Sequence, residues 1–237
     1  MYKRQLAHAP KDAPIGFAGY SQGGGASLSA AEYAERYAPD LNVAGTYAGA
    51  PPTDLPETMR SIDGSAIAHV LGYAINGFSE RSPEFRDAVL AELNPRGIDF
   101  LRSAATSCTG DSVLMWGFTN TRMLTRTGES LSEIVERKPV VKETLERQNL
   151  GKAVPNAPVM MASSPSDDLI SHDQVRRTAG AYCSMGGTID FVAAPGTATI
   201  PRTGIDHAVP LYLEMPVGLQ YLFDRFEGKP APTNCTA

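Results

Sequence analysis

The feature that most constrains this chain is a glycine-rich turn around Ser21, the segment Gly-Tyr-Ser-Gln-Gly at residues 19–23. Residues 14–21, which lead into it, form a short apolar stretch typical of a buried strand. After it, residues 26–37 are rich in Ala and Glu, carry apolar residues at helical spacing, and are closed by Pro39. We therefore predict a strand, a sharp turn at Ser21, and a helix.

The same five residues fit the pattern Gly-x-Ser-x-Gly, in which a strained strand-to-helix turn exposes a serine hydroxyl. Gly19 and Gly23 are small enough for such a turn, and Ser21 lies at a helix N-terminus, where developing negative charge is favoured. The pattern predicts that Ser21 is a nucleophile and that the backbone N–H of Gln22 binds an oxyanion. The alternatives are a turn with an inert serine and a phosphate-binding turn, which lacks support because neither G-x-G-x-x-G nor a Walker lysine is present.

A catalytic serine needs a histidine to accept its proton, and in folds with this turn the acid precedes that histidine in the chain. Of the four histidines, His207 fits best, because it lies in a Gly-bounded loop after the last expected strand. His8 precedes the serine, and His69 lies among helices, where a packing role is the simpler interpretation. His172 is a rival, but it lies so close to the acidic candidates that one loop would have to supply both roles.

The acid is expected in the loop Ser-Pro-Ser-Asp-Asp-Leu-Ile at residues 164–170, after the apolar segment 158–163. Asp167 takes the first acidic place in this loop, with Leu169 and Ile170 anchoring the chain behind it, so we favour Asp167. Asp168 is interpreted as a solvated loop charge. Asp206 is expected to face away from the site, because neighbours in an extended segment point apart.

Strand and helix signals alternate on both sides of a mainly helical region. Further strands are expected at 41–47, 158–163 and 188–193, and helices at 174–183 and 216–226. In the middle, Ser82-Pro83 is a typical helix start, and residues 128–147 form a helical pair broken near Pro139. We predict an α/β fold of the α/β-hydrolase type, with a parallel sheet from residues 1–52 and 156–237 and a helical cap or insertion at 53–155. The insertion is either a lid or a rigid subdomain.

Composition excludes some classes of function. The chain has 237 residues and a net charge of −5, which argues against nucleic acid as a partner. The best apolar run, residues 65–78, is interrupted by His69 and Asn76, so no transmembrane segment is predicted. Serine ester chemistry needs no metal or other cofactor, and no ligand cluster is visible in the sequence. The N-terminus shows no apolar signal-peptide core. Three cysteines allow either free thiols or one disulfide with one cysteine left over.

The chain resembles the secretory lipase family from about residue 12 to the end. The matching segments are Gly-Tyr-Ser-Gln-Gly-Gly at 19–24, residues 37–45, Ser-Asp-Asp-Leu-Ile at 166–170, residues 182–191, and the loop of His207. The resemblance implies hydrolysis of triacylglycerols or other lipid esters, secretion, and transient contact with a lipid interface. It also implies a disulfide between Cys183 and Cys235, while Cys108 would pair with a cysteine upstream of the turn.

That upstream cysteine is absent, and only about 13 residues precede the first strand, where this fold has several further strands. We hypothesise that the chain is the C-terminal part of a lipase, with the second oxyanion donor outside it. The strand before Ser21 would then lie at a sheet edge. Two other functions stay open: acyl transfer by the same triad, and a weakly active or non-catalytic remnant.

Overall fold

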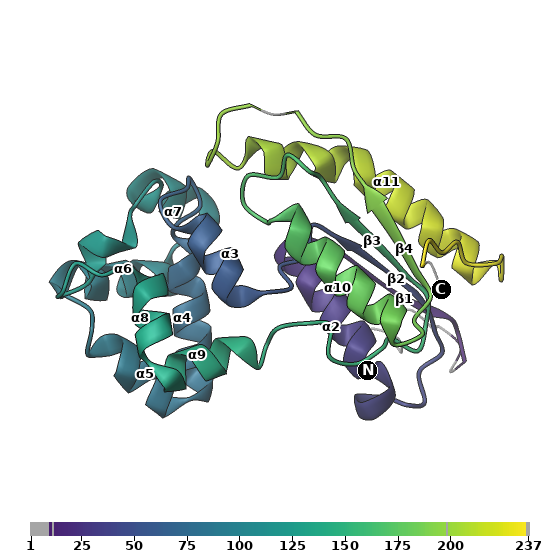
Figure 1. Cartoon of the computed structure of the whole chain (residues 1–237), viewed down its shortest axis with the longest axis horizontal. Coiled ribbons are helices and arrows are strands. Elements are labelled where there is room, and N and C mark those ends of the chain that lie inside the picture. The colour runs from purple at the N-terminus through teal and green to yellow at the C-terminus, as the bar shows by residue number, and fades with distance from the viewer. Residues whose placement is uncertain (1–9, 11, 198, 236–237) are drawn as a thin grey trace.

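The computed structural model describes residues 10, 12–197 and 199–235, and it contains a parallel sheet beside a group of short helices (Figure 1). Three parallel pairings join the strands in chain order, β1-β2-β3-β4. The strands are β1 Ile15–Tyr20, β2 Val43–Gly49, β3 Val159–Ser163 and β4 Ile189–Ala193. The predicted parallel sheet is therefore present, and among the described strands β1 pairs only with β2.

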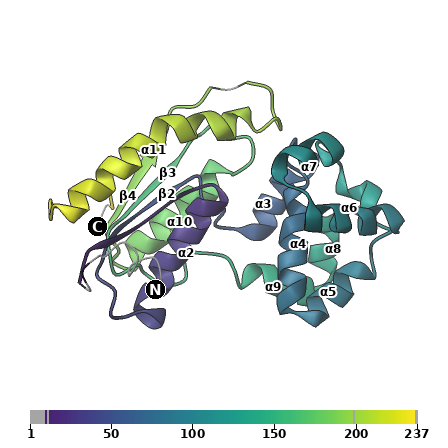
Figure 2. The same cartoon turned by 180° about the vertical axis from the view of Figure 1, so that it is seen from behind.

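Helices cover both faces of this sheet. They are α2 Gln22–Tyr37, α10 His172–Ser184 and α11 Ile205–Phe226. Side chains alternate along β3, so that Val159 and Met161 pack with the core beneath α2 and α10, while Met160 and Ala162 pack with the core beneath α11. Figures 1 and 2 show the strands between α11 and the other two helices.

Helix α2 begins directly after Ser21, four residues earlier than the expected start at Ala26. Its glycines allow this early start. A Cβ on Gly24 would lie 2.4 Å from the carbonyl oxygen of Gly49, so the first turn of the helix packs directly against the backbone of β2. Any side chain there would push the helix away from the strand.

Helix α11 differs most from the expectation. The sequence predicts a helix starting at Pro216 and a loop around His207, whereas the helix starts at Ile205 and contains both Pro210 and Pro216. Proline normally ends a helix because it lacks an N–H and clashes with the preceding turn. Here packing against the sheet sustains the helix through both prolines. A Cβ on Gly218 would lie 2.4 Å from the ring of Tyr47, which shows how closely α11 approaches β2.

The second part of the molecule is a group of short helices with a core of its own. They are α3 Leu55–Ile62, α4 Val70–Arg81, α5 Pro83–Leu90, α6 Pro95–Thr106, α7 Thr109–Trp116, the 3-10 helix η1 Thr121–Leu124, α8 Leu131–Arg137 and α9 Pro139–Glu146. As predicted, α5 starts at Ser82-Pro83, with the Ser82 side chain accepting a hydrogen bond from the Phe85 N–H, and Pro139 separates α8 from α9. None of the described helices combines the length and apolar character needed to cross a bilayer.

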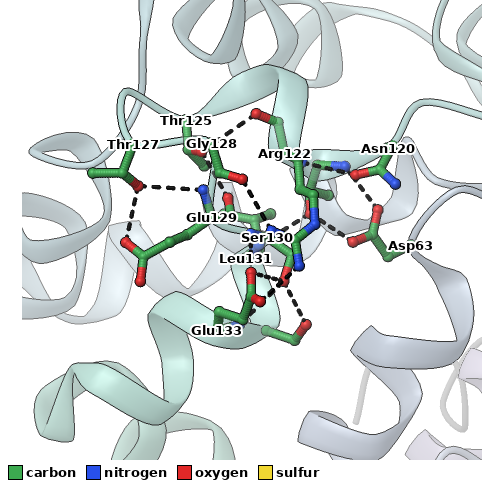
Figure 3. Close-up of polar contacts among 12 residues, drawn as sticks. Asp63, Asn120, Arg122, Thr125, Thr127, Gly128, Glu129, Ser130, Leu131 and Glu133 are labelled. Atoms are coloured by element: carbon green, nitrogen blue, oxygen red, sulfur yellow. Dashed lines mark hydrogen bonds and ion pairs between the residues drawn. The ribbon is translucent and has the colours of Figure 1, made fainter.

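A polar network holds the least regular stretch of this helical part together (Figure 3). The carboxylate of Asp63, at the end of α3, accepts hydrogen bonds from both the N–H and the hydroxyl of Thr121. The Thr121 hydroxyl accepts in turn from the N–H of Leu131, the first residue of α8. This network joins α3, η1 and α8.

Two buried side chains on the sheet's helices hold the ends of the helical part. Gln174 of α10 accepts from the N–H groups of Thr53 and Asp54, where the chain leaves the sheet. Glu32 of α2 accepts from the N–H groups of Gly151 and Lys152, where the chain returns. Because buried backbone donors need acceptors, these two side chains fix the points at which the helical part joins the sheet.

Candidate active site

Ser21 lies at the carboxyl end of β1, in the turn before α2. Its backbone has φ 56° and ψ −123°, a strained combination for a residue with a side chain. The turn closes tightly, because a Cβ on Gly19 would lie 2.1 Å from the carbonyl oxygen of Gly23. The strain and the two glycines place the hydroxyl of Ser21 at the N-terminus of α2, as the Gly-x-Ser-x-Gly pattern predicts.

His207 reaches Ser21 from the first turn of α11. Its Nε2 lies 2.8 Å from the Oγ of Ser21, and its Nδ1 lies 2.8 Å from Oδ2 of Asp167. The side chain of Asp167 is fully buried and that of His207 is 10% exposed, so the pair is shielded from water. The structure thus brings together the three side chains singled out from the sequence, although His207 lies on a helix rather than in a loop.

Asp167 is held rigidly within its own loop. Its other oxygen, Oδ1, accepts hydrogen bonds from the backbone N–H groups of Leu169 (2.9 Å) and Ile170 (2.8 Å). Both of these residues are buried in the core beneath α10, as expected for anchors. One carboxylate oxygen therefore fixes the loop while the other faces the imidazole.

The interpretation of Asp168 as a solvated loop charge is wrong. Its side chain is partly buried and accepts hydrogen bonds from the backbone N–H groups of Gly204 (2.8 Å) and His207 (3.1 Å). The first N–H groups of a helix lack partners within the helix, and a carboxylate satisfies them well. Sequence patterns do not indicate this contact, because they predict the start of α11 eleven residues further along the chain, at Pro216.

Asp206 faces away from the triad, as expected, but for a different reason. It lies on α11 beside His207, where successive side chains diverge around the helix axis. Its carboxylate accepts from the backbone N–H of Thr199 and from the hydroxyl of Thr197. Asp206 therefore orders the segment that leads from β4 to α11.

The other histidines lie elsewhere. His69 is buried and packs edge-on against Tyr73, with burial lowering its pKa. His172 begins α10, and its Nδ1 lies 3.2 Å from the carbonyl oxygen of Ser163 while its ring packs against Phe191. His8 lies outside the described residues.

Gln22 is the first residue of α2, so its N–H is one of the donors that a helix leaves free at its N-terminus. The first hydrogen bond of this helix runs from the Gly25 N–H to the Ser21 carbonyl oxygen. The Gln22 N–H follows Ser21 directly. It is therefore suited to donate to the oxyanion that forms when Oγ bonds to a carbonyl carbon.

Two further groups near the triad escaped sequence reasoning. The hydroxyl of Tyr20, the last residue of β1, donates a 2.7 Å hydrogen bond to the carbonyl oxygen of His207. Glu214 is buried on α11, two turns beyond His207, and burial followed by the charge of Asp167 raises its pKa to about 7. The seven-residue spacing places Glu214 and His207 on the same face of a continuous helix, but Pro210 and Pro216 hide that continuity in the sequence.

A disulfide joins Cys183, near the end of α10, to Cys235 in the C-terminal tail. The tail runs beside β4, where the side chain of Asn234 pairs with both the N–H and the carbonyl oxygen of Phe191. Cys108 is exposed, and its sulfur is a free thiol. The disulfide pairing is the one that the family resemblance implies.

Comparison with known proteins places the chain. Residues 3–234 match the family model described as secretory lipase. The chain is 32% identical over 222 residues to a Mycobacterium tuberculosis protein named a probable inactive lipase, covering 92% of this chain and 46% of that protein. It is 26% identical over 231 residues to a secreted triacylglycerol lipase of Malassezia globosa, covering 95% and 48% respectively. The chain spans about half the length of these curated relatives.

Solved structures agree with this placement. The crystal structure of Candida antarctica lipase A superposes with a TM-score of 0.84 at 20% identity, covering 98% of this chain and 53% of the lipase. A mutant of the rice cell wall degrading esterase LipA from Xanthomonas oryzae gives a TM-score of 0.73 at 16% identity, covering 94% and 62%. These neighbours confirm the predicted α/β-hydrolase fold. With the family model matching nearly the whole chain, this protein belongs to the secretory lipase family.

Proposed function

We propose that this chain carries the catalytic triad of a serine hydrolase that cleaves carboxylic esters of lipids. The observation that carries the proposal is the chain of contacts from Ser21 through His207 to Asp167, with 2.8 Å at each step. A serine hydroxyl becomes a useful nucleophile when a histidine can take its proton and a carboxylate orients that histidine. The strained backbone of Ser21 adds support, because strain of this kind gathers at functional sites.

In the proposed reaction, Oγ of Ser21 attacks the ester carbonyl carbon while Nε2 of His207 takes the hydroxyl proton. The carbonyl oxygen becomes an oxyanion next to the Gln22 N–H and the N-terminus of α2. When the carbon–oxygen bond of the ester breaks, His207 gives the proton to the departing alcohol and an acyl-serine remains. Water then attacks the acyl carbon while His207 accepts a proton from it. When the bond between the acyl carbon and Oγ breaks, His207 returns this proton to Oγ of Ser21, and the carboxylic acid is released.

Three considerations support lipid esters as the substrates and the outside of the cell as the place of action. The family is described as secretory lipases, and relatives from Malassezia are named secreted triacylglycerol lipases. The disulfide between Cys183 and Cys235 suits an oxidising compartment. We assign the helical part, residues 53–155, the role of a cap that shapes the acyl-binding region and contacts the lipid interface transiently.

A second candidate function is a non-catalytic protein that retains the fold. It is favoured by the relative named a probable inactive lipase, and by the fact that only one oxyanion donor is identified among the described residues. Loss of one such donor typically slows turnover by about 10²–10³-fold. If the chain is non-catalytic in this sense, Ser21 neither hydrolyses esters at a measurable rate nor reacts with strong electrophiles.

Labelling with a fluorophosphonate probe separates the two functions, because the probe reacts with an activated serine. We expect the purified protein to be labelled and to hydrolyse p-nitrophenyl esters, and the Ser21→Ala variant to lose both properties. Ser184→Ala, which alters an exposed serine at the end of α10, is the matched control and should behave like the parent protein. An unlabelled parent protein, or a labelled Ser21→Ala variant, would refute the triad. Adding glycerol and analysing the products tests for acyl transfer by the same acyl-enzyme.

A further inference from the structure

Side chains from two different segments form hydrogen bonds with the main chain of His207. The first set of these bonds lies at the N-terminus of α11. The residue before this helix is Gly204, with φ +79°, and it has no side chain with which to cap the helix. A Cβ at this position would lie 3.2 Å from a methyl group of Leu169, so a larger residue would be crowded as well as strained. The cap therefore has to come from another part of the chain.

Asp168 supplies it. Its Oδ2 accepts from the Gly204 N–H at 2.8 Å, and its Oδ1 accepts from the His207 N–H at 3.1 Å. Hydrogen bonds from backbone N–H groups to a carboxylate are stronger than those between neutral groups. The loop after β3 thus grips the helix at two points, one of which is the residue whose ring faces Ser21.

The second contact is with the carbonyl oxygen of His207. Tyr20, the last residue of β1, donates its hydroxyl to the carbonyl oxygen of His207 at 2.7 Å, and the two rings lie 5.4 Å apart. The phenol is partly buried, and burial raises its pKa, so the hydroxyl keeps its proton as a donor. The N–H and the carbonyl of His207 are therefore both fixed by side chains outside its own helix.

These contacts follow a common pattern. Asp167 and Asp168 are neighbours, and one binds the ring of His207 while the other binds its N–H. Tyr20 and Ser21 are also neighbours, and one binds the carbonyl of His207 while the other faces its ring. In each of these two pairs of sequence neighbours, one side chain contacts the imidazole of His207 and the other contacts its main chain.

We propose that Asp168 and Tyr20 are positioning residues that clamp the main chain of His207 and thereby hold its ring between Ser21 and Asp167. The proposal rests on the proposed function, since it assigns their roles through the reaction of Ser21. The position of an imidazole follows from its backbone as well as from its side-chain rotamer. Fixing the N–H and the carbonyl of His207 therefore removes the backbone contribution to variation in both nitrogen-to-oxygen distances. A misplacement of about 1 Å at a reacting group can cost about 100-fold in rate.

The test uses Asp168→Asn, which turns one acceptor into a donor facing an N–H, and Tyr20→Phe, which removes the donor to the carbonyl. Asp173→Asn is the matched control, because Asp173 is an exposed aspartate in the first turn of α10 that pairs with Arg176. For each clamp variant we expect kcat for a p-nitrophenyl ester, and the rate of fluorophosphonate labelling, to fall about 10- to 100-fold. KM should stay within about twofold, because the clamp does not touch the substrate in this role.

A second readout does not depend on turnover. The proton that His207 shares with Asp167 should give a far-downfield NMR signal, assigned by its loss in His207→Gln. We expect this signal to broaden or vanish in both clamp variants and to persist in Asp173→Asn. If Asp168→Asn does not fold, as judged by its thermal melt, Tyr20→Phe still tests the clamp from the other side.

The outcomes are distinct. Clamp variants that keep both the labelling rate and the NMR signal of the parent protein would overturn the clamp while leaving the triad intact. A parent protein that is not labelled would refute the proposed function, and the NMR signal would still decide whether Asp168 and Tyr20 hold the ring.

Discussion

Each face of the sheet buries one glutamate, and the two glutamates have different surroundings. Glu32, on the face covered by α2 and α10, accepts hydrogen bonds through Oε1 from two backbone N–H groups and from the hydroxyl of Tyr182. Glu214, on the face covered by α11, accepts no well-aligned hydrogen bond at either oxygen within the described part of the chain, although the nearby hydroxyl of Tyr47 partly offsets the rise in its pKa. Glu32 therefore acts as a structural joint. Burial of Glu214, in contrast, disfavours the charged form of its carboxyl group.

The outer surfaces of the helices differ in the same sense. Across α2 and α10, the only large apolar side chain that is exposed belongs to Tyr37, at the end of α2. Helix α11 exposes a row of them, at Ile205, Tyr212, Leu213, Val217, Leu219, Phe223 and Phe226. Both observations mark the α11 face, which carries His207, as the less completely satisfied side of the molecule.

Removing Glu32 should have the largest effect on stability. In Glu32→Ala, the N–H groups of Gly151 and Lys152 and the Tyr182 hydroxyl lose their acceptor, so we expect the free energy of unfolding to fall by about 3–4 kcal/mol. Urea unfolding at neutral pH measures this change. Glu35→Ala, which alters an exposed position of the same helix, is the control and should change stability by less than about 0.5 kcal/mol. Equal effects of the two variants would mean that Glu32 is no structural joint.

Glu214 should make the free energy of unfolding depend on pH. Its pKa rises from the ordinary 4.5 to about 7 in the folded protein. Between these values the folded chain binds more protons than the unfolded chain, so the free energy of unfolding should decrease as pH rises through this window. The full decrease amounts to about 3 kcal/mol and is complete above the folded-state pKa.

Glu214→Gln should remove this dependence and unfold at higher urea concentration than the parent protein at pH 8. Glu227→Gln, at an exposed position just after α11, serves as the control and should leave the pH profile unchanged. If the free energy of unfolding of Glu214→Gln and that of Glu227→Gln change in parallel between pH 4.5 and 8, Glu214 contributes nothing to the pH dependence. That result would contradict the assignment.

The smallest expected effects on stability come from replacing one glycine on each side of the sheet. A Cβ on Gly218 would meet the buried ring of Tyr47, whereas a Cβ on Gly180, exposed in α10, would meet nothing within 4 Å. We expect Gly218→Ala to cost about 1–3 kcal/mol through overpacking and Gly180→Ala to add about 0.5–1 kcal/mol through its better helix propensity. Thermal melts should therefore shift in opposite directions. Shifts in the same direction would show that α11 can move away from β2.

The sequence predicts the part of the site that depends on short-range chemistry. The turn at Ser21 follows from its glycines, and Asp167 and His207 follow from chain order and from the apolar anchors behind the acid. The roles of Asp168, Tyr20 and Glu214 depend on where α11 begins, and the two prolines conceal that start. A proline is a local signal, whereas the packing of Gly218 against Tyr47 that sustains the helix joins residues far apart in the chain.

The C-terminal tail has a consequence for where this protein can persist. A sheet edge with free N–H and carbonyl groups is a template for association with other chains, and the pairing of Asn234 with β4 occupies part of that edge. The disulfide spans 52 residues, which corresponds to about 4 kcal/mol of stabilisation in the chain-entropy view. In a reducing environment the tail would lose this covalent bond and depend on its hydrogen bonds to β4, so resistance to self-association at β4 should weaken as the surroundings become reducing.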